Sequence, residues 1–258
     1  MRVAYPMTYD PLQLAKETKK IVAKGVLRKY YRRSRPGRWY GGIASADCCG
    51  CNLRCVFCWS GAPRDNPERI GEFYSPEQIF SSLVACAKKH GYGQLRVSGN
   101  EPTIAKDHLL RLLELVDETG YRFILETNGI LIGQNPDYAK KLSKFRSVQV
   151  RVSIKGTNEE QFSRLTGAIP EAFALQFKAL ENLLDAGVPS HAAVMLSFSS
   201  KEDFSELLNH LREIDRGLAE NVEEEYVFLY PHVTKLLSES GIRPRIAYGP
   251  DKAPKELI

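Results

Sequence analysis

The stretch GGIASADCCGCNLRCVFC, residues 41–58, joins a short apolar run to a loop that holds five of the six cysteines of the chain. The run 41–47 predicts a β-strand, and the cysteines follow directly after it. A disulfide framework would distribute its cysteines along the chain, whereas clustered cysteines are typical of metal or redox chemistry. We therefore expect this strand and its loop to hold the functional centre.

Beyond this loop, strand-like and helix-like stretches alternate, which predicts parallel strands joined by right-handed crossovers. Residues 75–91 illustrate the helix signal, because Ser75 is a good N-cap, Gln78 completes a capping box and Gly91 ends the helix. The other expected strands are 94–99, 121–127, 147–156, 190–198 and 225–232, and the other expected helices are 105–119, 136–143, 158–166, 170–186, 201–216 and 233–240.

Six strand–helix units in 258 residues predict an α/β fold, a partial (β/α)6 TIM-type barrel that is open on one side. In such barrels the chemistry lies at the carboxyl ends of the strands. Unusual residues occupy five of these ends, at 51–58, 98–102, 126–129, 153–156 and 230–232. We expect them to converge on one face.

The charge of the chain is unevenly distributed. The net charge is +5, yet the segment 16–38 holds ten basic residues and one acidic residue, interleaved with aromatic side chains. We expect residues 1–40 to form a basic N-terminal helical extension, which docks on the core or contacts RNA or another acidic partner. Residues 41–242 should form the core, and residues 243–258 an irregular C-terminal tail.

The hydropathy of the chain gives no sign of a membrane segment. No apolar run reaches the roughly 20 residues that a membrane span needs, and the N-terminus lacks the pattern of a secretory signal. We therefore expect a cytoplasmic protein without membrane contacts, in which thiols stay reduced.

The spacing of Cys51, Cys55 and Cys58 suits an iron–sulfur cluster, because thiolates are the usual ligands of such clusters. Most clusters take four cysteines, so three would leave one iron open to an external ligand. The alternative is a zinc site, which needs four ligands and would take Cys48 or Cys49 as the fourth. Zinc would leave the motifs at the other strand ends unexplained.

The motif CxxxCx(aromatic)C, with Phe57 as its aromatic residue, resembles the radical S-adenosylmethionine superfamily, and the resemblance covers most of residues 43–232. It implies an enzyme in which a [4Fe–4S] cluster on the three cysteines binds the amino and carboxylate groups of S-adenosylmethionine. Reductive cleavage would then give methionine and a 5′-deoxyadenosyl radical. The electron would come from a donor such as a ferredoxin or a flavodoxin.

The same resemblance implies cofactor contacts at other strand ends. SGNEP, residues 98–102, is similar to a GGEP segment that binds the amino group of S-adenosylmethionine. Asn100 replaces the second glycine, and asparagine is the next-best residue where a positive φ is needed. ETNG, residues 126–129, is similar to a segment that contacts the ribose or faces the substrate.

VSIKG, residues 152–156, carries Ser153 and Lys155 on one face of a strand. In the subgroup that activates glycyl-radical enzymes the matching pattern is Asp-x-Lys, so Lys155 would neutralise the methionine carboxylate. LYPH, residues 229–232, is similar to a segment beside the adenine. The implied cofactor-binding residues are Phe57, Gly99, Asn100, Glu101, Glu126, Asn128, Ser153, Lys155, Leu229 and His232.

The substrate is open at this level. Resemblance to the activating subgroup favours hydrogen abstraction from a protein or peptide position, whereas the basic N-terminal segment favours RNA or a nucleotide-derived small molecule. A hypothesis of another class is a non-catalytic iron–sulfur or zinc module. The sequence has no second cysteine set for an auxiliary cluster.

Overall fold

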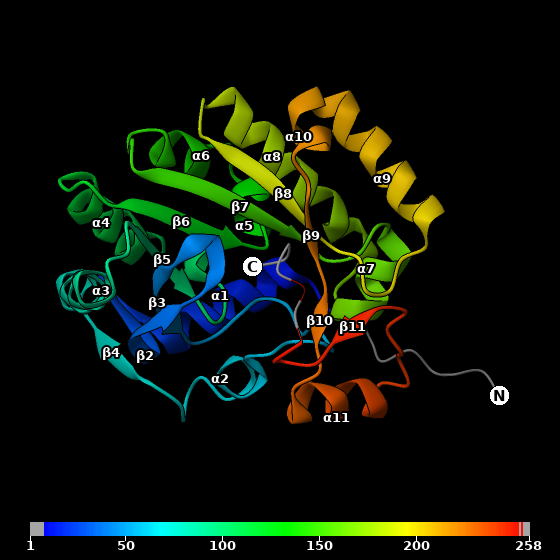
Figure 1. Ribbon diagram of the computed structural model, residues 1–258, viewed down its shortest axis with the longest axis horizontal. Coiled ribbons are helices and arrows are strands. Elements are labelled where there is room, and N and C mark those ends of the chain that lie inside the picture. The colour runs from blue at the N-terminus through cyan, green and yellow to red at the C-terminus, as the bar shows by residue number, and fades with distance from the viewer. Residues whose placement is uncertain (1–7, 253, 255–258) are drawn as a thin grey trace.

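The structure, a computed structural model that describes residues 8–252 and 254, is built round a nine-stranded mixed sheet whose strands follow a partly closed arc (Figure 1). Six neighbouring strands of this sheet are parallel. They are β3 (Ile43–Cys48), β5 (Gln94–Ser98), β6 (Arg122–Thr127), β7 (Val148–Ile154), β8 (Ser190–Met195) and β9 (Glu223–Glu225). The predicted α/β fold, a partial TIM-type barrel, is confirmed.

Helices follow the parallel strands and cover the outer face of the arc (Figure 1). They are α3 (Pro76–His90), α4 (Lys106–Asp117), α5 (Ile130–Gln134), α6 (Pro136–Leu142), α7 (Glu159–Thr166), α8 (Ala174–Asp185), α9 (Lys201–Ile214) and α10 (Arg216–Glu220). The predicted start of α3 is confirmed, because Ser75 and Gln78 form the capping box and Gly91 ends the helix at a φ of 70°. Short 3₁₀ turns are η1 (Trp39–Gly41), η2 (Pro102–Ala105) and η3 (Pro170–Phe173).

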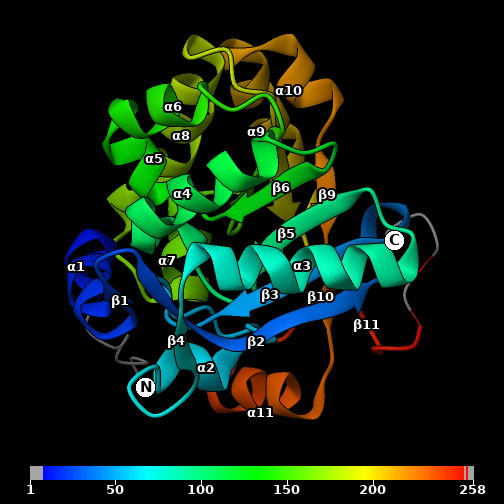
Figure 2. The ribbon, with the colours of Figure 1, turned by 90° about the vertical axis from the view of Figure 1, so that its left-hand side faces the viewer.

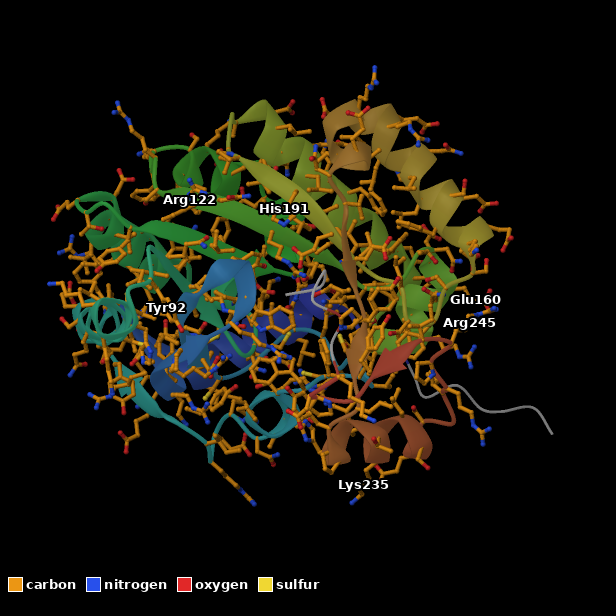
Figure 3. The ribbon with its side chains drawn as sticks, in the orientation of Figure 1. Tyr92, Arg122, Glu160, His191, Lys235 and Arg245 are labelled. Atoms are coloured by element: carbon orange, nitrogen blue, oxygen red, sulfur yellow. The ribbon has the colours of Figure 1, made fainter. Side chains whose placement is uncertain are left out.

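The two faces of the parallel strands differ in chemistry. In β5, Leu95 and Val97 are buried in the apolar core, whereas Arg96 and Ser98 alternate with them and point inside the arc. Charged side chains also cover the outside of the molecule, where Lys235 extends from its helix into solvent (Figure 3). The inside of the arc is therefore polar and the layer between sheet and helices is apolar.

The N-terminal segment differs from the prediction. Of the described residues 8–38, Pro11–Val22 form the α-helix α1, and β1 (Ala23–Lys24) and β2 (Leu27–Gly37) follow it. β2 pairs antiparallel with β3 and with β4 (Glu72–Tyr74), so it belongs to the main sheet. The prediction of a helical extension over residues 27–37 was wrong, because these residues satisfy backbone groups that β3 would otherwise expose as an edge strand.

The C-terminal part also departs from the prediction. The expected strand 225–232 is divided into β9 and β10 (Val227–Phe228), and the chain then enters α11 (Pro231–Glu239). β10 pairs in parallel with β11 (Ala247–Tyr248), so the tail is not wholly irregular. Residues 1–7, 253 and 255–258 of the expected extension and tail lie outside the described residues.

Two remaining features position the site. α2 (Gly61–Asp65) follows the cysteines directly, and α1 packs against η2 and α5 near the carboxyl ends of the parallel strands (Figure 2).

In the described part of the chain, we find no helix with both the length and the apolar character that a membrane crossing requires.

Candidate functional site

A cavity of about 590 Å³ lies inside the arc, and strand-end loops converge on it. Its lining includes Cys51, Cys55 and Cys58 together with nine of the ten residues predicted to bind the cofactor. Leu229 alone of those ten does not line it, because its side chain is exposed while its backbone N–H bonds Tyr248 of β11. The predicted convergence of the strand ends is therefore present in the fold.

The cysteine loop, residues 49–58, is held in place by backbone bonds. The N–H of Cys58 donates to the carbonyl of Cys55 at 3.1 Å, and the Arg64 guanidinium donates to that same carbonyl at 2.6 Å. Burial raises the pKa of the Cys51 thiol well above its usual range and that of Cys55 to about 11, although nearby Lys155 opposes the latter shift. Metal binding would supply the positive charge that deprotonates these thiols.

Cys48 and Cys49 face away from the cavity. Cys48 is fully buried beside the Arg28 guanidinium, and the Cys49 thiol donates to the carbonyl of Ile70 at 3.4 Å. Across residues 8–252 and 254, no three His, Cys, Asp or Glu side chains lie close enough to hold a single metal ion. This geometry does not fit a closed zinc site, whereas an iron–sulfur cluster spreads its thiolate ligands over separate irons.

A pair of amides tests whether the pocket fits such a cluster. The side-chain nitrogen of Asn128 lies 3.9 Å from the Cys51 sulfur and donates to the Asn52 side-chain oxygen at 2.8 Å. Asn52 is fully buried, and its own amide nitrogen has no acceptor among the described groups. Asn128 lines the cavity, so its amide offers a donor to a thiolate at Cys51, which fits a cysteine that acts as a cluster ligand.

The SGNEP segment is shaped by Gly99 and Asn100. Gly99 has a φ of 90°, and a Cβ there would lie 3.0 Å from the Cβ of Asp47 and 3.1 Å from the carbonyl oxygen of Cys48. Asn100 does not have a positive φ, so the backbone here does not require glycine or asparagine. Its side chain instead accepts from the N–H of Gly50 at 2.8 Å and donates to the carbonyl of Ser60 at 3.0 Å. Asn100 thus joins SGNEP to both ends of the cysteine loop.

Glu101 connects the ends of β5 and β6. Its buried carboxylate accepts four hydrogen bonds, two from Thr103, one from the Thr127 hydroxyl at 2.7 Å and one from the N–H of Asn128 at 2.8 Å. These bonds hold the loop that carries Asn128 against the loop that carries Gly99. Glu101 therefore shapes the cavity as well as lining it.

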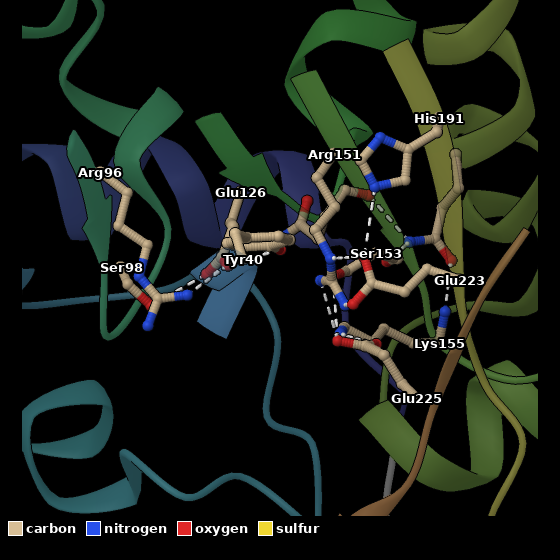
Figure 4. A network of polar contacts seen from close by, with 12 residues as sticks. Tyr40, Arg96, Ser98, Glu126, Arg151, Ser153, Lys155, His191, Glu223 and Glu225 are labelled. Atoms are coloured by element: carbon tan, nitrogen blue, oxygen red, sulfur yellow. Dashed lines mark hydrogen bonds and ion pairs between the residues drawn. The ribbon is translucent and has the colours of Figure 1, made fainter. Parts of the chain in front are cut away.

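Glu126 lies at the centre of a first group of polar contacts (Figure 4). Arg96 pairs with it, the Ser98 hydroxyl donates to it at 3.0 Å, and the Tyr40 hydroxyl donates to it at 3.3 Å. Burial acts to raise the pKa of Glu126, but Arg96 and Arg151 outweigh that effect and lower it. Glu126 is therefore held as a carboxylate inside the arc.

Arg151 organises a second group in the same view (Figure 4). Its guanidinium binds Glu223 through two nitrogens at 2.7 Å each and Glu225 at 3.0 Å, and it donates to the Ser153 hydroxyl at 2.8 Å. Lys155 pairs with Glu225 at 3.2 Å. The Ser153 hydroxyl donates to the same Glu225 carboxylate at 3.4 Å, so Ser153 and Lys155 share it.

Sequence reasoning missed Arg96, Arg151, Glu223 and Glu225 as members of the site. A signal existed for the two arginines, because each stands between two apolar residues of a strand and must point to the face opposite those neighbours. The two glutamates belong to a short strand with no apolar pattern. Only the pairing of β8 with β9 brings them beside Arg151.

The open side of the arc is bridged by aromatic and polar contacts. The rings of Trp39 and Phe228 are 5.8 Å apart, and the ring of His232 hydrogen-bonds the carbonyl of Trp59 at 2.8 Å. Phe57 packs against Phe198 with ring centres 5.6 Å apart. Phe57 and His232, two of the residues predicted to bind the cofactor, both line the cavity.

Comparison with known proteins gives one family match. A family model described as the Radical SAM superfamily matches residues 47–211, which is more than half of the chain. A probable GTP 3',8-cyclase of Methanosarcina acetivorans is 32% identical over 141 residues, covering 54% of this chain and 40% of that protein. A probable GTP 3',8-cyclase of Saccharolobus islandicus is 29% identical over 185 residues, covering 70% and 54%. The chain spans about half the length of these curated relatives.

Solved structures share the fold. A radical SAM methyltransferase from Sphaerobacter thermophilus matches with a TM-score of 0.55 at 16% identity, over 81% of this chain and 67% of that chain. Streptococcus suis SuiB bound to S-adenosylmethionine matches with a TM-score of 0.53 at 17% identity, over 78% and 48%. At these identities the likeness concerns the fold alone.

Proposed function

Because the chain belongs to the radical SAM superfamily, whose cofactors are a [4Fe–4S] cluster and S-adenosylmethionine, we propose that Cys51, Cys55 and Cys58 hold the cluster in this cavity. This proposal rests on one observation: three thiols in one loop and residues from five other strand ends line a single cavity. When bound, the cluster supplies one electron that breaks the S–C5′ bond of S-adenosylmethionine, giving methionine and a 5′-deoxyadenosyl radical. The core that does this is the proposed unit 41–242.

The chain's own residues bind and orient S-adenosylmethionine. Backbone carbonyls near Gly99, where the absence of a side chain lets a ligand approach the backbone closely, receive the amino group. The Lys155 ammonium receives the methionine carboxylate as a point charge. Glu126 and Ser153 face the ribose, and Phe57 and His232 flank the adenine. Burial acts to lower the pKa of Lys155, but the neighbouring Glu225 and Cys55 outweigh that effect and raise it, so Lys155 carries its charge at neutral pH.

The substrate gives up a hydrogen atom, and two classes are proposed. A nucleotide-derived substrate is favoured by the mouth of the cavity, where both tryptophans of the chain, Trp39 and Trp59, line the wall with Arg32 and Arg35. The Arg35 guanidinium lies 5.6 Å from the centre of the Trp59 ring. Aromatic faces and guanidinium groups suit a base and its phosphates, and the curated relatives named above are probable GTP 3',8-cyclases.

The second class is a protein or peptide position, as in the subgroup that activates glycyl-radical enzymes. Its support is the position of Lys155 and the LYPH segment, residues 229–232. Leu229 lies outside the cavity lining, which weakens the match of that segment. We therefore place this class second.

The test is anaerobic. The protein is reconstituted with iron and sulfide and given S-adenosylmethionine and dithionite, and 5′-deoxyadenosine is measured. Wild type and the Cys86→Ala control should form it, because Cys86 lies on α3 away from the cavity. Cys55→Ala should form none. An intact wild-type cluster that never yields 5′-deoxyadenosine would refute the proposal.

The substrate class is tested by isotope transfer. Deuterated nucleoside triphosphates and deuterated peptides are offered in parallel, and mass spectrometry follows deuterium into 5′-deoxyadenosine. Transfer from a nucleotide supports the first class, and transfer from a peptide alone would replace it with the second.

A further inference from the structure

Helix α1 lies directly against the cysteine loop. The Thr18 hydroxyl is 3.5 Å from the carbonyl oxygen of Cys51. A Cβ at Gly50 would come within 2.6 Å of Thr18 and 2.8 Å of Val22, so the helix and the loop touch with no space between them. In Figure 2 the arrowheads of β3 and β6 point toward the side on which α1 lies. The helix thus covers the cysteine loop on the side away from the cavity.

The inner face of α1 is apolar and packs on the loops that shape the cavity. Ala15 and Val22 are buried in one apolar group with Cys49 and Ile104, and Leu131 of α5 packs against that group. Cys49, Ile104 and Leu131 belong to the segments that follow β3, β5 and β6. Since an α-helix with its side chains is about 10 Å across, solvent begins about one helix diameter from the cysteine loop.

The outer face of α1 is basic, and we call it the α1 lysine face. It consists of Lys16, Lys19 and Lys20, which stand at helical spacing, together with Lys24 of β1, and all four are exposed. Among the residues that the structure describes, none of the four pairs with a carboxylate, unlike Lys140, Lys178 and Lys235. Ile21 is 39% exposed and Val26 51% exposed beside them. A basic rim round exposed apolar residues is typical of a protein-docking surface.

The aromatic residues of this segment are not available to a nucleic acid. Tyr30 is buried and its hydroxyl bonds the ring of His108 at 2.9 Å, while the hydroxyl of Tyr31 bonds Ser60 at 2.8 Å. Recognition of single-stranded RNA depends on stacking of bases on exposed aromatic rings as well as on basic charge. Neither tyrosine of the segment therefore stands free beside the α1 lysine face, and an acidic protein surface suits this face better than RNA.

The proposed function requires one electron from outside the chain for each cleavage. The cavity itself is taken by S-adenosylmethionine and substrate, so the electron has to enter through the other side of the cysteine loop. Resting on the proposed function, we infer that the α1 lysine face is the docking surface for an acidic one-electron carrier protein. The carrier is oxidised by one electron and the protein-bound cluster is reduced by one, and no proton, group or bond is exchanged at this contact.

Such contacts are small, weak and steered by charge, so ionic strength and charge reversal should act on the rate of electron delivery. The test compares 5′-deoxyadenosine formation driven by reduced flavodoxin, an acidic one-electron carrier, with formation driven by dithionite. The variant is Lys16→Glu/Lys19→Glu/Lys20→Glu. The matched control is Lys140→Glu/Lys141→Glu/Lys144→Glu, three exposed lysines on and just after α6.

We expect the variant to lose about tenfold or more of the flavodoxin-driven rate at low salt, as charge steering predicts, and to keep its dithionite-driven rate. The control should keep both, and added salt should slow the flavodoxin-driven reaction of wild type. An unchanged flavodoxin-driven rate in the variant overturns the inference. If in addition wild type binds RNA and the variant does not, the lysine face is an RNA surface instead.

The dithionite arm separates this inference from the proposed function. A wild-type protein that forms 5′-deoxyadenosine with dithionite but shows no charge-dependent difference with flavodoxin leaves the proposed function standing and refutes the docking surface. A wild-type protein that forms none with dithionite refutes the proposed function, and the docking surface with it.

Discussion

Five thiols lie within eleven residues of this chain, and the fold divides them into two sets. Cys51, Cys55 and Cys58 line the cavity, whereas Cys48 and Cys49 are fully buried on its far side. The division occurs at Gly50, whose φ of 81° turns the chain where α1 presses against it. Closeness in sequence therefore does not show which thiols face the cavity. The backbone turn at Gly50 determines which of them do.

The largest effect should come from the cavity-facing set. Replacing Cys51, Cys55 or Cys58 singly by alanine removes a proposed ligand, and we expect the reconstituted protein to lose at least about tenfold in iron content. Iron and sulfide analysis with the absorbance near 400 nm measures this. Full iron content in all three variants would show that the cavity-facing thiols do not hold the cluster, which would contradict the proposed difference between the two sets.

The second prediction concerns Lys155, which faces the same cavity. Lys155→Met removes the charge proposed to bind the methionine carboxylate, and losing a charge-assisted hydrogen bond should weaken binding of S-adenosylmethionine about tenfold to a hundredfold. Equilibrium binding to the reconstituted protein measures it. Lys178→Met, on the exposed face of α8, is the control. Equal affinity in the two variants would remove Lys155 from the binding site.

The third prediction concerns pH. Burial acts to raise the pKa of Glu223, but hydrogen bonds from His191 and Arg151 outweigh it and lower the pKa to about 2. A lowered carboxyl pKa contributes stability above the unfolded value near 4.5, and that stability is lost as pH falls from there toward 2. The melting temperature of metal-free wild type should drop through this window, and Glu223→Gln should flatten the drop. Parallel curves would contradict the assignment.

The smallest effect should come from the buried set. Cys49→Ala removes only a weak thiol bond and a small apolar volume, so we expect a loss of about 1 kcal/mol in the free energy of unfolding. Its iron content should equal that of wild type. A Cys49→Ala protein without iron would place Cys49 among the ligands and reopen the question of a fourth thiolate.

Local patterns in the sequence predicted most of the parallel core, because many of its helices and strands carry their own caps or apolar periodicity. Ser75, Gln78 and Gly91 placed α3 almost to the residue. The motif at residues 51–58 likewise lies in the predicted place, after the first parallel strand. Such features depend on neighbours in the chain and are visible in a single sequence.

The missed features depend on partners that are distant in sequence. β2 has a run of arginines and no clear alternation, and it forms a strand because β3 and β4 flank it. The Arg151–Glu223 pair joins residues 72 positions apart. Leu229 follows β10, and no local signal indicates that β10 is separated from β9. Pairing across the sheet, rather than propensity, determines all three.

The central claim is that three thiols hold a cluster with one iron left open for S-adenosylmethionine. Electron paramagnetic resonance of the reduced, reconstituted protein tests it most directly, with and without S-adenosylmethionine. The account predicts the signal of a reduced [4Fe–4S] cluster whose g values shift when S-adenosylmethionine is added, in wild type and in Cys49→Ala alike. A signal that S-adenosylmethionine leaves unchanged would contradict it, because every iron would then already be ligated by the protein.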